Sequence, residues 1–348
     1  MVISKFDKIY DSIKDGKTIL GVGPMSKNCI DAVVELANER KIPLLLIGSR
    51  RQIEASSLGS GYVWDTKSLS EYVKSKDVGN YVFLARDHGG PWQGTDENSL
   101  SYEEAMTNAL VSYKCDIESG FDIIHLDPSL KPRSYDEILL DVMTLYRKCE
   151  EYANDFGADI IFEAGTEEHG GHITSPDQFK DFVTKVKADC PKIKFVVGNM
   201  GLFIKEARNV GSFDEEQAKT LVSICNENDV LLKGHNTDYI DLKTFARHPT
   251  LGVHSVNMAP SFGVTETKTL LNLLSPTDRA KFIEIAYNSN KWYKWMIDFD
   301  QSIEYKATIA GHYVFSNPEV QEMMLPFNEN LKDAVKNDIL QHLIALGW

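Results

Sequence analysis

The feature that most constrains the fold is a repeated alternation of short apolar runs with longer amphipathic stretches. Each apolar run is rich in Val, Ile and Leu and ends in polar or Gly residues. The runs cover residues 18–22, 43–48, 81–87, 123–127, 159–164, 194–199, 230–234 and 253–257. Near-continuous apolar strands alternating with helices are typical of a parallel sheet that is covered on both faces. We therefore predict an α/β fold with eight parallel strands.

The number of these units favours a closed barrel over an open sheet. Apolar residues recur at helical spacing between the strands, as at Met106, Leu110 and Tyr113. Eight strand–helix units over roughly 250 residues match a (β/α)8 TIM barrel. No Gly-x-Gly-x-x-Gly follows the first strand, which argues against a dinucleotide-binding fold. We predict a barrel over residues 1–275 and a C-terminal helical extension, residues 276–348, packed on it.

Composition restricts the partners and the compartment. The net charge of −14 argues against nucleic acid or an anionic membrane as partner, since both require a basic face. No run reaches 18 apolar residues, and the N-terminal segment lacks the apolar core of a signal peptide. The five cysteines are scattered without a CxxC pair, which indicates reduced thiols in a cytoplasmic protein and excludes a cysteine zinc site. A phosphorylated small molecule remains compatible, because phosphate needs only a local group of donors and cations.

The chemistry of such a barrel sits at the C-terminal ends of its strands. Strand 3 ends in Asp87 and His88, strand 7 ends in His235, and strand 5 carries Glu163 and is followed by Glu167. Two histidines and a carboxylate are the ligand type expected of a catalytic Zn²⁺, with Mn²⁺ or Co²⁺ as alternatives. We predict His88, His235 and Glu167 or Glu163 as metal ligands. Asp87 is the predicted general base for a substrate hydroxyl.

Further polar residues at strand ends complete the predicted site. Asp238 is a second predicted catalytic carboxylate beside Glu163. His125 lies mid-strand and is interpreted as an inward-facing histidine beneath the site rather than as a ligand. The residues predicted to bind substrate are Asn199, Asn236, Asn257, Ser261 and Arg50, the last as a phosphate contact or a surface arginine.

Several segments carry a family resemblance. RDHGGPWQ, GFDIIHLDPS, EAGTEEHGG, GHNTDY and NMAPSFG are similar, in order and spacing, to the Z-type subunit of tagatose-bisphosphate aldolase, in the class II aldolase superfamily. The resemblance implies an aldolase-type barrel in which Asp87 is the acid/base carboxylate and His88 and His235 are zinc ligands. It also implies that Glu163 matches the strand-5 glutamate and Asn257 the substrate-binding asparagine of strand 8.

Two departures from the superfamily bear on function. Catalytic class II aldolases carry a further zinc histidine after strand 6, where residues 198–200 of this chain contain none. Their strand-7 loop is a Gly-rich, Ser-containing phosphate cradle, whereas residues 235–239 read HNTDY. Either a carboxylate completes the metal site, or the metal is weakly bound or absent, and a phosphate, if the substrate has one, must be held differently. The Z-type subunit is regarded as a non-catalytic stabiliser of a partner aldolase, and some relatives look like ketose-phosphate 4-epimerases.

Three functional hypotheses follow. The first is metal-dependent aldol cleavage of a ketose (bis)phosphate, such as a tagatose or fructose phosphate, in which Asp87 accepts the proton of the C4 hydroxyl. The second is a 4-epimerase, in which the aldehyde rotates and adds back. The third is a stabilising subunit of an aldolase, and either a homo-oligomer or a complex with a partner subunit is compatible with the sequence. A kinase has no support, because no glycine-rich loop is followed by Lys and Ser or Thr.

Overall fold

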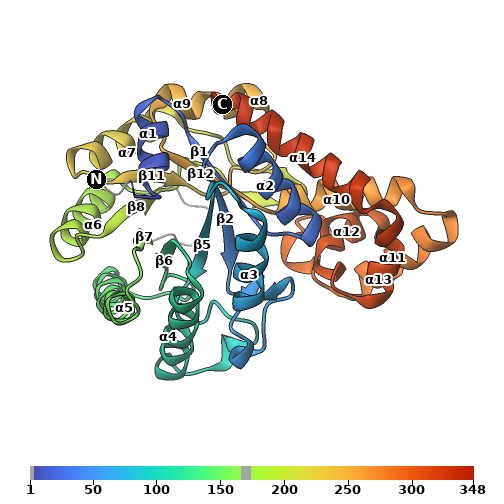
Figure 1. Ribbon diagram of the computed structural model, residues 1–348, viewed down its shortest axis with the longest axis horizontal. Coiled ribbons are helices and arrows are strands. Elements are labelled where there is room, and N and C mark those ends of the chain that lie inside the picture. Colours follow the sequence, from blue (N-terminus) through green and yellow to red (C-terminus); the bar gives the residue numbers. More distant parts are fainter. Residues whose placement is uncertain (1–3, 166–173) are drawn as a thin grey trace.

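The computed structural model describes residues 4–165 and 174–348, in which eight parallel strands close into a barrel (Figure 1). The strands are β1 (Ile19–Val22), β2 (Leu44–Ser49), β5 (Val82–Gly89), β6 (Ile123–Leu126), β7 (Ile161–Gly165), β8 (Ile193–Val197), β11 (Leu231–Gly234) and β12 (Ser255–Met258). β12 pairs with β1, with Ile19 opposite Ser255, and this pairing closes the barrel. Each predicted apolar run overlaps one strand, so the prediction of a (β/α)8 barrel is confirmed.

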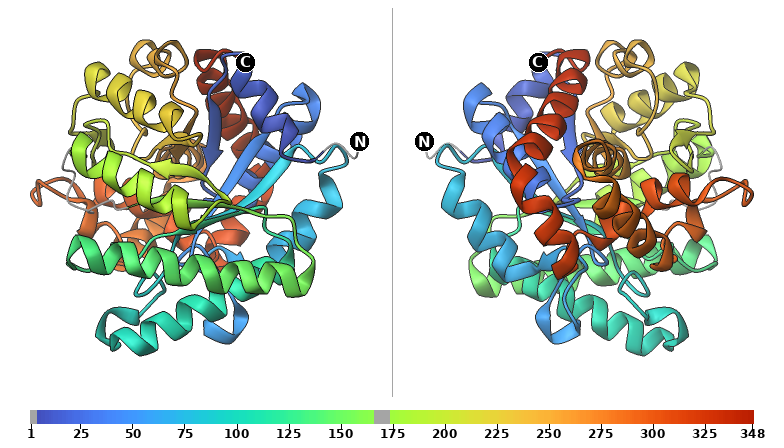
Figure 2. Two further views of the ribbon diagram at one scale, coloured as in Figure 1. Left: turned by 90° about the vertical axis from the view of Figure 1, so that its left-hand side faces the viewer. Right: turned by 90° about the vertical axis from the view of Figure 1, so that its right-hand side faces the viewer.

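Helices surround the strands on the outside (Figure 2). They are α2 (Lys27–Arg40), α3 (Thr66–Lys76), α4 (Tyr102–Ser119), α5 (Tyr135–Phe156), α6 (Pro176–Asp189), α7 (Glu215–Glu227), α8 (Leu242–Phe245), α9 (Arg247–Leu251) and α10 (Pro260–Leu273). Two of these helices begin at capping boxes, Ser101 with Glu104 and Ser134 with Glu137, in which side chains satisfy the first free amides. Local sequence signals thus fix where α4 and α5 start.

The lower part of the barrel interior is apolar. Because side chains alternate between the two faces of a strand, every second residue points inward. Phe6 and Ile9, at the start of helix α1 (Asp7–Lys14), pack into this region. The strand residues of the same cluster are Ile19, Leu45, Ile47, Phe83, Ala85, Ile123, Ile161 and Phe195. This apolar plug closes the N-terminal end, so polar chemistry is confined to the other end.

The C-terminal segment forms two parts. Helices α11 (Pro276–Asn288), α12 (Ile303–Ala310) and α13 (Pro318–Met324) share a separate apolar cluster with α10, to one side of the barrel (Figure 1). Helix α14 (Asn328–Ala345) returns along α2 and α10. Its residues Val335, Ile339 and Leu343 belong to the main core of the barrel. The division at residue 275 remains a prediction, and α14 shares its core with the part before that boundary.

Two small sheets decorate the C-terminal end of the barrel. β3 (Ile53–Glu54) pairs with β4 (Trp64–Asp65), and β9 (Ile204–Lys205) forms an antiparallel hairpin with β10 (Arg208–Asn209). Across the described residues, no helix has both the length and the apolar character needed to cross a membrane.

A buried ion pair anchors the end of β5, which carries the predicted site. Arg86 points outward from the barrel and donates to both carboxylate oxygens of Asp116 at 2.8 and 2.6 Å. It also donates to the carbonyl oxygens of Gly48 and Ile53 at 2.9 and 2.7 Å. The side chains of Arg86 and Asp116 are fully buried, so the pair depends on both partners being present.

We predict that Arg86→Leu lowers the free energy of unfolding by about 3–5 kcal/mol, because it leaves the Asp116 carboxylate buried and unpaired. Arg247→Leu is the matched control, since Arg247 and Glu215 form a similar pair with side chains 43% and 39% exposed. The control should lose much less stability, because an ion pair in contact with water contributes little. Urea unfolding measures both. Equal losses in the two variants would contradict the anchoring role of Arg86.

A second buried carboxyl joins α10 to α2. Oε2 of Glu266 accepts a hydrogen bond from the Ser26 hydroxyl at 2.5 Å, and Oε1 accepts one from Nδ2 of Asn28 at 2.9 Å. Burial outweighs these two hydrogen bonds and raises the pKa of Glu266 from 4.5 to about 7. The folded state therefore binds this proton more tightly than the unfolded state, and stability falls as pH rises from 4.5 to 7.

We expect Glu266→Gln to remove this pH-dependent loss of stability. The shift of the Glu266 pKa from 4.5 to about 7 corresponds to a loss of about 3 kcal/mol in the free energy of unfolding once pH exceeds 7. The amide keeps a donor and an acceptor for Ser26 and Asn28 without a charge. The melting temperature of the variant relative to the wild type should rise between pH 5 and pH 8. A difference that does not change with pH would show that Glu266 titrates at its ordinary value.

Candidate functional site

Polar residues occupy the inward-facing positions directly above the apolar plug. Ile123 lies in the plug, and His125, two residues along β6, faces the same interior. On β7, Glu163 likewise lies two residues after the plug residue Ile161. His125 and Glu163 are opposite each other in the pairing of β6 with β7. On β11, Lys233 also lies at an inward position. The register of the barrel thus brings these side chains to one level.

A bulge shapes the end of β5. The pairing of β5 with β6 shifts register between Arg86 and Gly89, and His88 has a φ of +44°, which is uncommon for a residue with a side chain. A bulge places an extra residue against its partner strand and re-aims the side chains around it. As a result, Asp87 and His88, although adjacent in sequence, both line the cavity at the barrel mouth.

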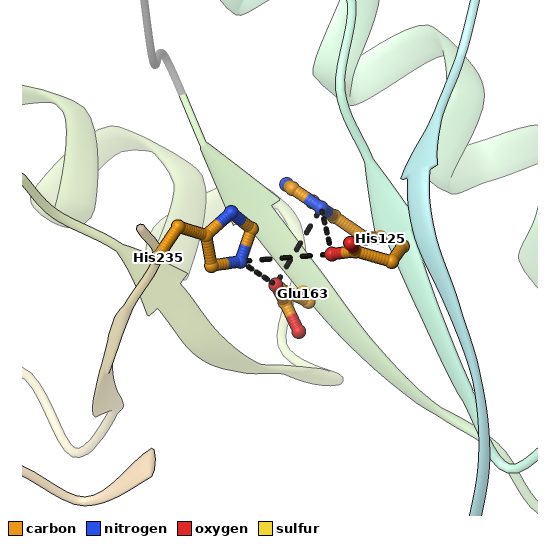
Figure 3. A group of neighbouring side chains, drawn as sticks. His125, Glu163 and His235 are labelled. Atoms are coloured by element: carbon orange, nitrogen blue, oxygen red, sulfur yellow. Dashed lines mark hydrogen bonds and ion pairs between the residues drawn. The ribbon is translucent and has the colours of Figure 1, made fainter. Parts of the chain in front are cut away.

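Two carboxylates and two imidazoles converge on one point. Donor atoms of Asp87, His125, Glu163 and His235 all lie within 4.8 Å of one another. His235 Nε2 is 3.3 Å from Oε1 of Glu163 and 3.7 Å from Oδ1 of Asp87. His125 Nδ1 is 3.5 and 3.9 Å from the same two oxygens. Figure 3 shows His125, Glu163 and His235 pointing toward one another from β6, β7 and the end of β11.

His88 is the third histidine of the group. Its Nδ1 lies 2.7 Å from Oδ2 of Asp127, and Asp127 is held in turn by Nε2 of Gln93 at 2.9 Å and the amide of Ser129 at 3.1 Å. The other ring nitrogen, Nε2, lies 4.0 Å from Oδ2 of Asp87. A carboxylate on one imidazole nitrogen, with the second nitrogen facing the site, is the usual arrangement of a metal-ligating histidine.

The geometry fits a divalent ion. The ring centroids of His88, His125 and His235 lie 5.0 Å (His88–His235), 5.5 Å (His88–His125) and 5.5 Å (His125–His235) apart. Imidazoles that bind one tetrahedral ion at about 2.0–2.1 Å have ring centroids roughly 5 Å apart. Nδ1 of His125, the nitrogen nearest Glu163 and Asp87, accepts a hydrogen bond from the amide of His88 at 3.3 Å, whereas Nε2 is buried with no hydrogen-bond partner among the described residues. The donor set of imidazoles and carboxylates is the type that zinc and similar ions prefer.

The charge of the cluster also favours a cation. Burial alone would raise the pKa of Glu163, but the ammonium of Lys233, 2.5 Å from Oε2, and the neighbouring histidines lower it to about 2. Burial likewise opposes ionisation of Asp87, but His88 and His235 hold its pKa well below the usual range. Both carboxylates are therefore ionised at neutral pH.

His88 responds to the same carboxylates. Burial would lower its pKa, but Asp87 and Asp127 outweigh burial and raise it to about 9. Without a bound ion, a proton on His88 thus offsets part of the negative charge of the site. A divalent ion that binds here would supply that positive charge in its place.

A cavity of about 970 Å³ opens above the cluster. Asp87, His88, His235 and Asn257 line its inner end, and Nδ2 of Asn257 donates to Oδ1 of Asp87 at 3.1 Å. The wall includes the C-terminal extension through residues 290–291, 293–295 and 312–313. A cavity of this size accommodates a small organic substrate.

Most predicted site residues lie at this cavity, and their roles remain predictions. Those that line it are Asp87, His88, Asn199, His235, Asn236, Asp238 and Asn257. Glu163 is buried next to the inner end, and Glu167 lies outside the described residues. Asp238 does more than line the wall, because its Oδ1 accepts hydrogen bonds from the amides of Ala259 and Ser261. Ser261 does not line the cavity, and its hydroxyl donates to Asp238 at 2.7 Å.

The structure corrects the position expected for Arg50. Its side chain is fully buried and lies 2.6 Å from a carboxylate oxygen of Glu54 and 2.6 Å from one of Glu97. It also donates to the carbonyl oxygen of Gly90 at 2.9 Å. These contacts occupy the guanidinium, so Arg50 is not free to hold a phosphate. The next residue, Arg51, lines the cavity instead.

Sequence reasoning missed two members of the cluster. His125 was interpreted as lying beneath the site, yet it contributes a nitrogen to the convergent group. Lys233 was not singled out, although it forms the buried ion pair with Glu163. The two-residue alternation along each strand could have found both, because His125 and Lys233 lie two residues before Asp127 and His235.

Comparisons with known proteins support the fold. No family model matches the chain, and no curated protein matches it significantly. Among solved structures, one from Sinorhizobium meliloti 1021, described as "a probable tagatose 6 phosphate kinase", has a TM-score of 0.75 at 17% identity, covering 95% of this chain and 100% of that chain. The fructose-bisphosphate aldolase of Campylobacter jejuni has a TM-score of 0.61 at 15% identity, covering 99% and 94%. The fructuronate-tagaturonate epimerase UxaE of Cohnella laeviribosi has a TM-score of 0.64 at 14% identity, covering 95% and 81%. At these identities the likeness shows a shared barrel fold.

Proposed function

We propose that this protein is a metal-dependent enzyme that performs aldol cleavage or addition on a ketose (bis)phosphate. One observation carries the proposal: a buried group of ionised carboxylates and imidazoles lies at the inner end of a cavity large enough for a sugar phosphate. Solved structures of aldolases and of a sugar-acid epimerase share the barrel, which is compatible with this chemistry.

The proposed ligands are three histidines and one glutamate: His88, His125, His235 and Glu163. His125 comes from the fourth strand of the barrel and would supply the third imidazole that class II aldolases carry after strand 6. Asp127 orients His88 through a hydrogen bond to its Nδ1. Lys233 binds Oε2 of Glu163, which leaves Oε1 facing the histidines. A bound zinc, manganese or cobalt ion would supply a Lewis acid that stabilises negative charge on the substrate's carbonyl oxygen.

Asp87 is the proposed proton acceptor. It lines the cavity, is ionised at neutral pH, and is oriented by the hydrogen bond from Asn257. From this position it can accept the proton of the C4 hydroxyl as the C3–C4 bond breaks. The side chain of Asn257, beside both Asp87 and His235, is placed to orient the reacting part of the substrate.

Two outcomes share this first step. If the aldehyde leaves, the enzyme is an aldolase; if it rotates and adds back on its other face, the enzyme is a 4-epimerase. The C-terminal extension forms one wall of the cavity through residues 290–291 and 293–295, and a walled cavity favours retention of the aldehyde. Product analysis separates the outcomes: aldehyde release detected by a coupled assay indicates cleavage, and a changed C4 configuration detected by NMR indicates epimerisation.

We predict that the purified protein binds about one equivalent of a divalent metal, and that His125→Ala and His235→Ala each lower its metal content. Loss of a residue that orients a metal ligand typically weakens metal binding by about 10- to 100-fold, and loss of the ligand itself should weaken it at least as much. His342→Ala is the control, since His342 contacts Asp338 and lies outside the cavity. Elemental analysis measures all four proteins. Unchanged metal in the two cavity variants would show that the ligand set is wrong.

If the wild-type protein neither contains nor takes up zinc, manganese or cobalt, the catalytic proposal fails. The stabilising-subunit hypothesis would then take its place, and a partner aldolase would be sought.

We predict that Asp87→Asn lowers turnover of a ketose phosphate by about 100-fold or more, because an amide cannot accept the hydroxyl proton. Its metal content should stay close to that of the wild type, since the amide retains the shape of the side chain and an oxygen for Asn257. Asp189→Asn, an exposed position on α6, is the matched control. Full activity in the Asp87 variant would exclude it as the proton acceptor.

A further inference from the structure

At the position where this fold commonly binds phosphate, a carboxylate of the protein itself accepts the hydrogen bonds. In many TIM barrels, phosphate lies between the loops after strands 7 and 8, at a helix N-terminus. Here the corresponding helix, α10, begins at Pro260, and the amides of Ala259 and Ser261 donate to Oδ1 of Asp238 at 3.0 and 2.9 Å. A carboxylate therefore occupies the helix N-terminus and would repel a phosphate.

The glycine-containing loop at the cavity is also unsuitable. Residues 59–62 (GSGY) line the cavity, and such loops can hold phosphate through free backbone amides. In this loop the four amides donate instead to carbonyl oxygens of Ser56, Ala55, Trp64 and Arg51. No amide of the loop remains for an anion. With these two backbone sites occupied, the cationic side chains that line the cavity are candidates for binding a phosphate among the described residues.

Four cationic side chains line the cavity: Arg51, Lys205, Lys291 and Lys294. In the part of the chain that the structure describes, none of the four forms a salt bridge with a carboxylate, and the acidic residues that line the cavity are Asp87, Asp96 and Asp238. The chain as a whole carries a net charge of −14. Unneutralised cations that line one cavity of an acidic protein create a local positive potential that attracts an anion.

Lys205 and Lys294 are held next to each other. Nζ of Lys205 donates to the backbone carbonyl of Lys294 at 3.0 Å. Nζ of Lys294 lies 4.9 Å from the ring centre of Trp295 and 5.3 Å from that of Tyr313. The indole N–H of Trp295 donates to the Tyr313 hydroxyl at 3.1 Å. This hydrogen bond holds together the two aromatic rings that lie near the Lys294 ammonium. Two ammonium groups from distant parts of the chain thus share one wall.

A buried glutamate joins the two segments that carry these lysines. The amide of Glu206, in the β9–β10 hairpin, donates to the carbonyl of Trp295 at 2.7 Å. Its Oε1 accepts hydrogen bonds from the amides of Ile297 and Asp298 at 3.2 and 2.9 Å. The Glu206 side chain is 3% exposed, so these bonds are shielded from water. The hairpin and the C-terminal extension are therefore held together.

The hairpin is also tied to the catalytic end of the barrel. Nδ2 of Asn209 donates to the carbonyl oxygens of Asn236 and Asp238 at 2.8 and 3.1 Å. Asn236 and Asp238 lie one and three residues after His235 in the sequence. Hydrogen bonds thus connect the lysine wall to the segment that places His235 at the inner end of the cavity.

We infer that Lys205 and Lys294 form the phosphate subsite for the substrate, and that Arg51 and Lys291 add positive charge to the same cavity. The identity of the ligand as a ketose phosphate rests on the proposed function. A phosphate dianion bound by both ammonium groups would form charge-assisted hydrogen bonds with them. The subsite would use the C-terminal extension instead of the loops after strands 7 and 8.

Isothermal titration calorimetry of the purified full chain with inorganic phosphate tests the subsite. The Lys205→Gln/Lys294→Gln protein should bind phosphate about tenfold more weakly than the wild type. The matched control is Lys243→Gln/Lys268→Gln, which removes the same charge at two exposed positions outside the cavity. Equal affinity in the two double variants would overturn the inference, and so would a wild-type protein that does not bind phosphate.

The failure of this inference can be told apart from the failure of the proposed function. Phosphate binding requires neither a bound metal nor turnover, so it can persist in a protein that proves non-catalytic. If the enzyme is active, the Lys205→Gln/Lys294→Gln protein should show a raised KM for the ketose phosphate and little change in kcat. An unchanged KM beside a metal-dependent reaction would reject the lysine subsite and leave the proposed function in place.

Discussion

The two-residue alternation of side chains along eight closed parallel strands is the constraint from which the rest of this structure follows. Each strand directs every second side chain inward, so the barrel interior consists of layers of side chains. The residue that each strand carries at a given level decides whether that layer is apolar or polar. The lower layer is apolar and sealed by Phe6 and Ile9. The layer above it holds His125, Glu163 and Lys233. Because the apolar layer excludes water from below, charges in the upper layer interact strongly with one another and with whatever enters from the open end.

Two buried ion pairs near the barrel mouth stabilise different parts of the site. The Arg86–Asp116 pair lies outside the strands and holds the end of β5, where the bulge directs Asp87 and His88 to the cavity. The Lys233–Glu163 pair lies inside and fixes one glutamate oxygen, leaving the other for the histidines. Removing one partner of a buried pair leaves an uncompensated charge, so the geometry of the mouth depends on both partners of each pair.

The fold was predictable from sequence because its signals are local and repeated. Each apolar run overlapped a strand, and capping residues such as Ser134 marked where helices begin. Residues at strand ends, including Asp87 and His235, were predicted at the cavity for the same reason. Arg50 shows the limit: its neighbour Arg51 has the same chemistry, and only the position of Glu54 and Glu97 decides which of the two is buried. Such contacts join residues that are far apart in the chain or are brought together by a sharp turn. The pattern of consecutive residues does not show which of these contacts form.

The sequence by itself determined the barrel, the end at which its polar residues gather, and the chemical types present there, because strand alternation and strand ends are properties of consecutive residues. Tertiary structure decided which of those residues meet. It brought His125 into the convergent group through its pairing with Glu163, and it placed Asp238 on the start of α10. It also set Lys205 beside Lys294 across a long separation in the chain. The physical reason is that a metal or phosphate site needs atoms within a few ångströms of one another, and that proximity is fixed by barrel closure and by long-range hydrogen bonds.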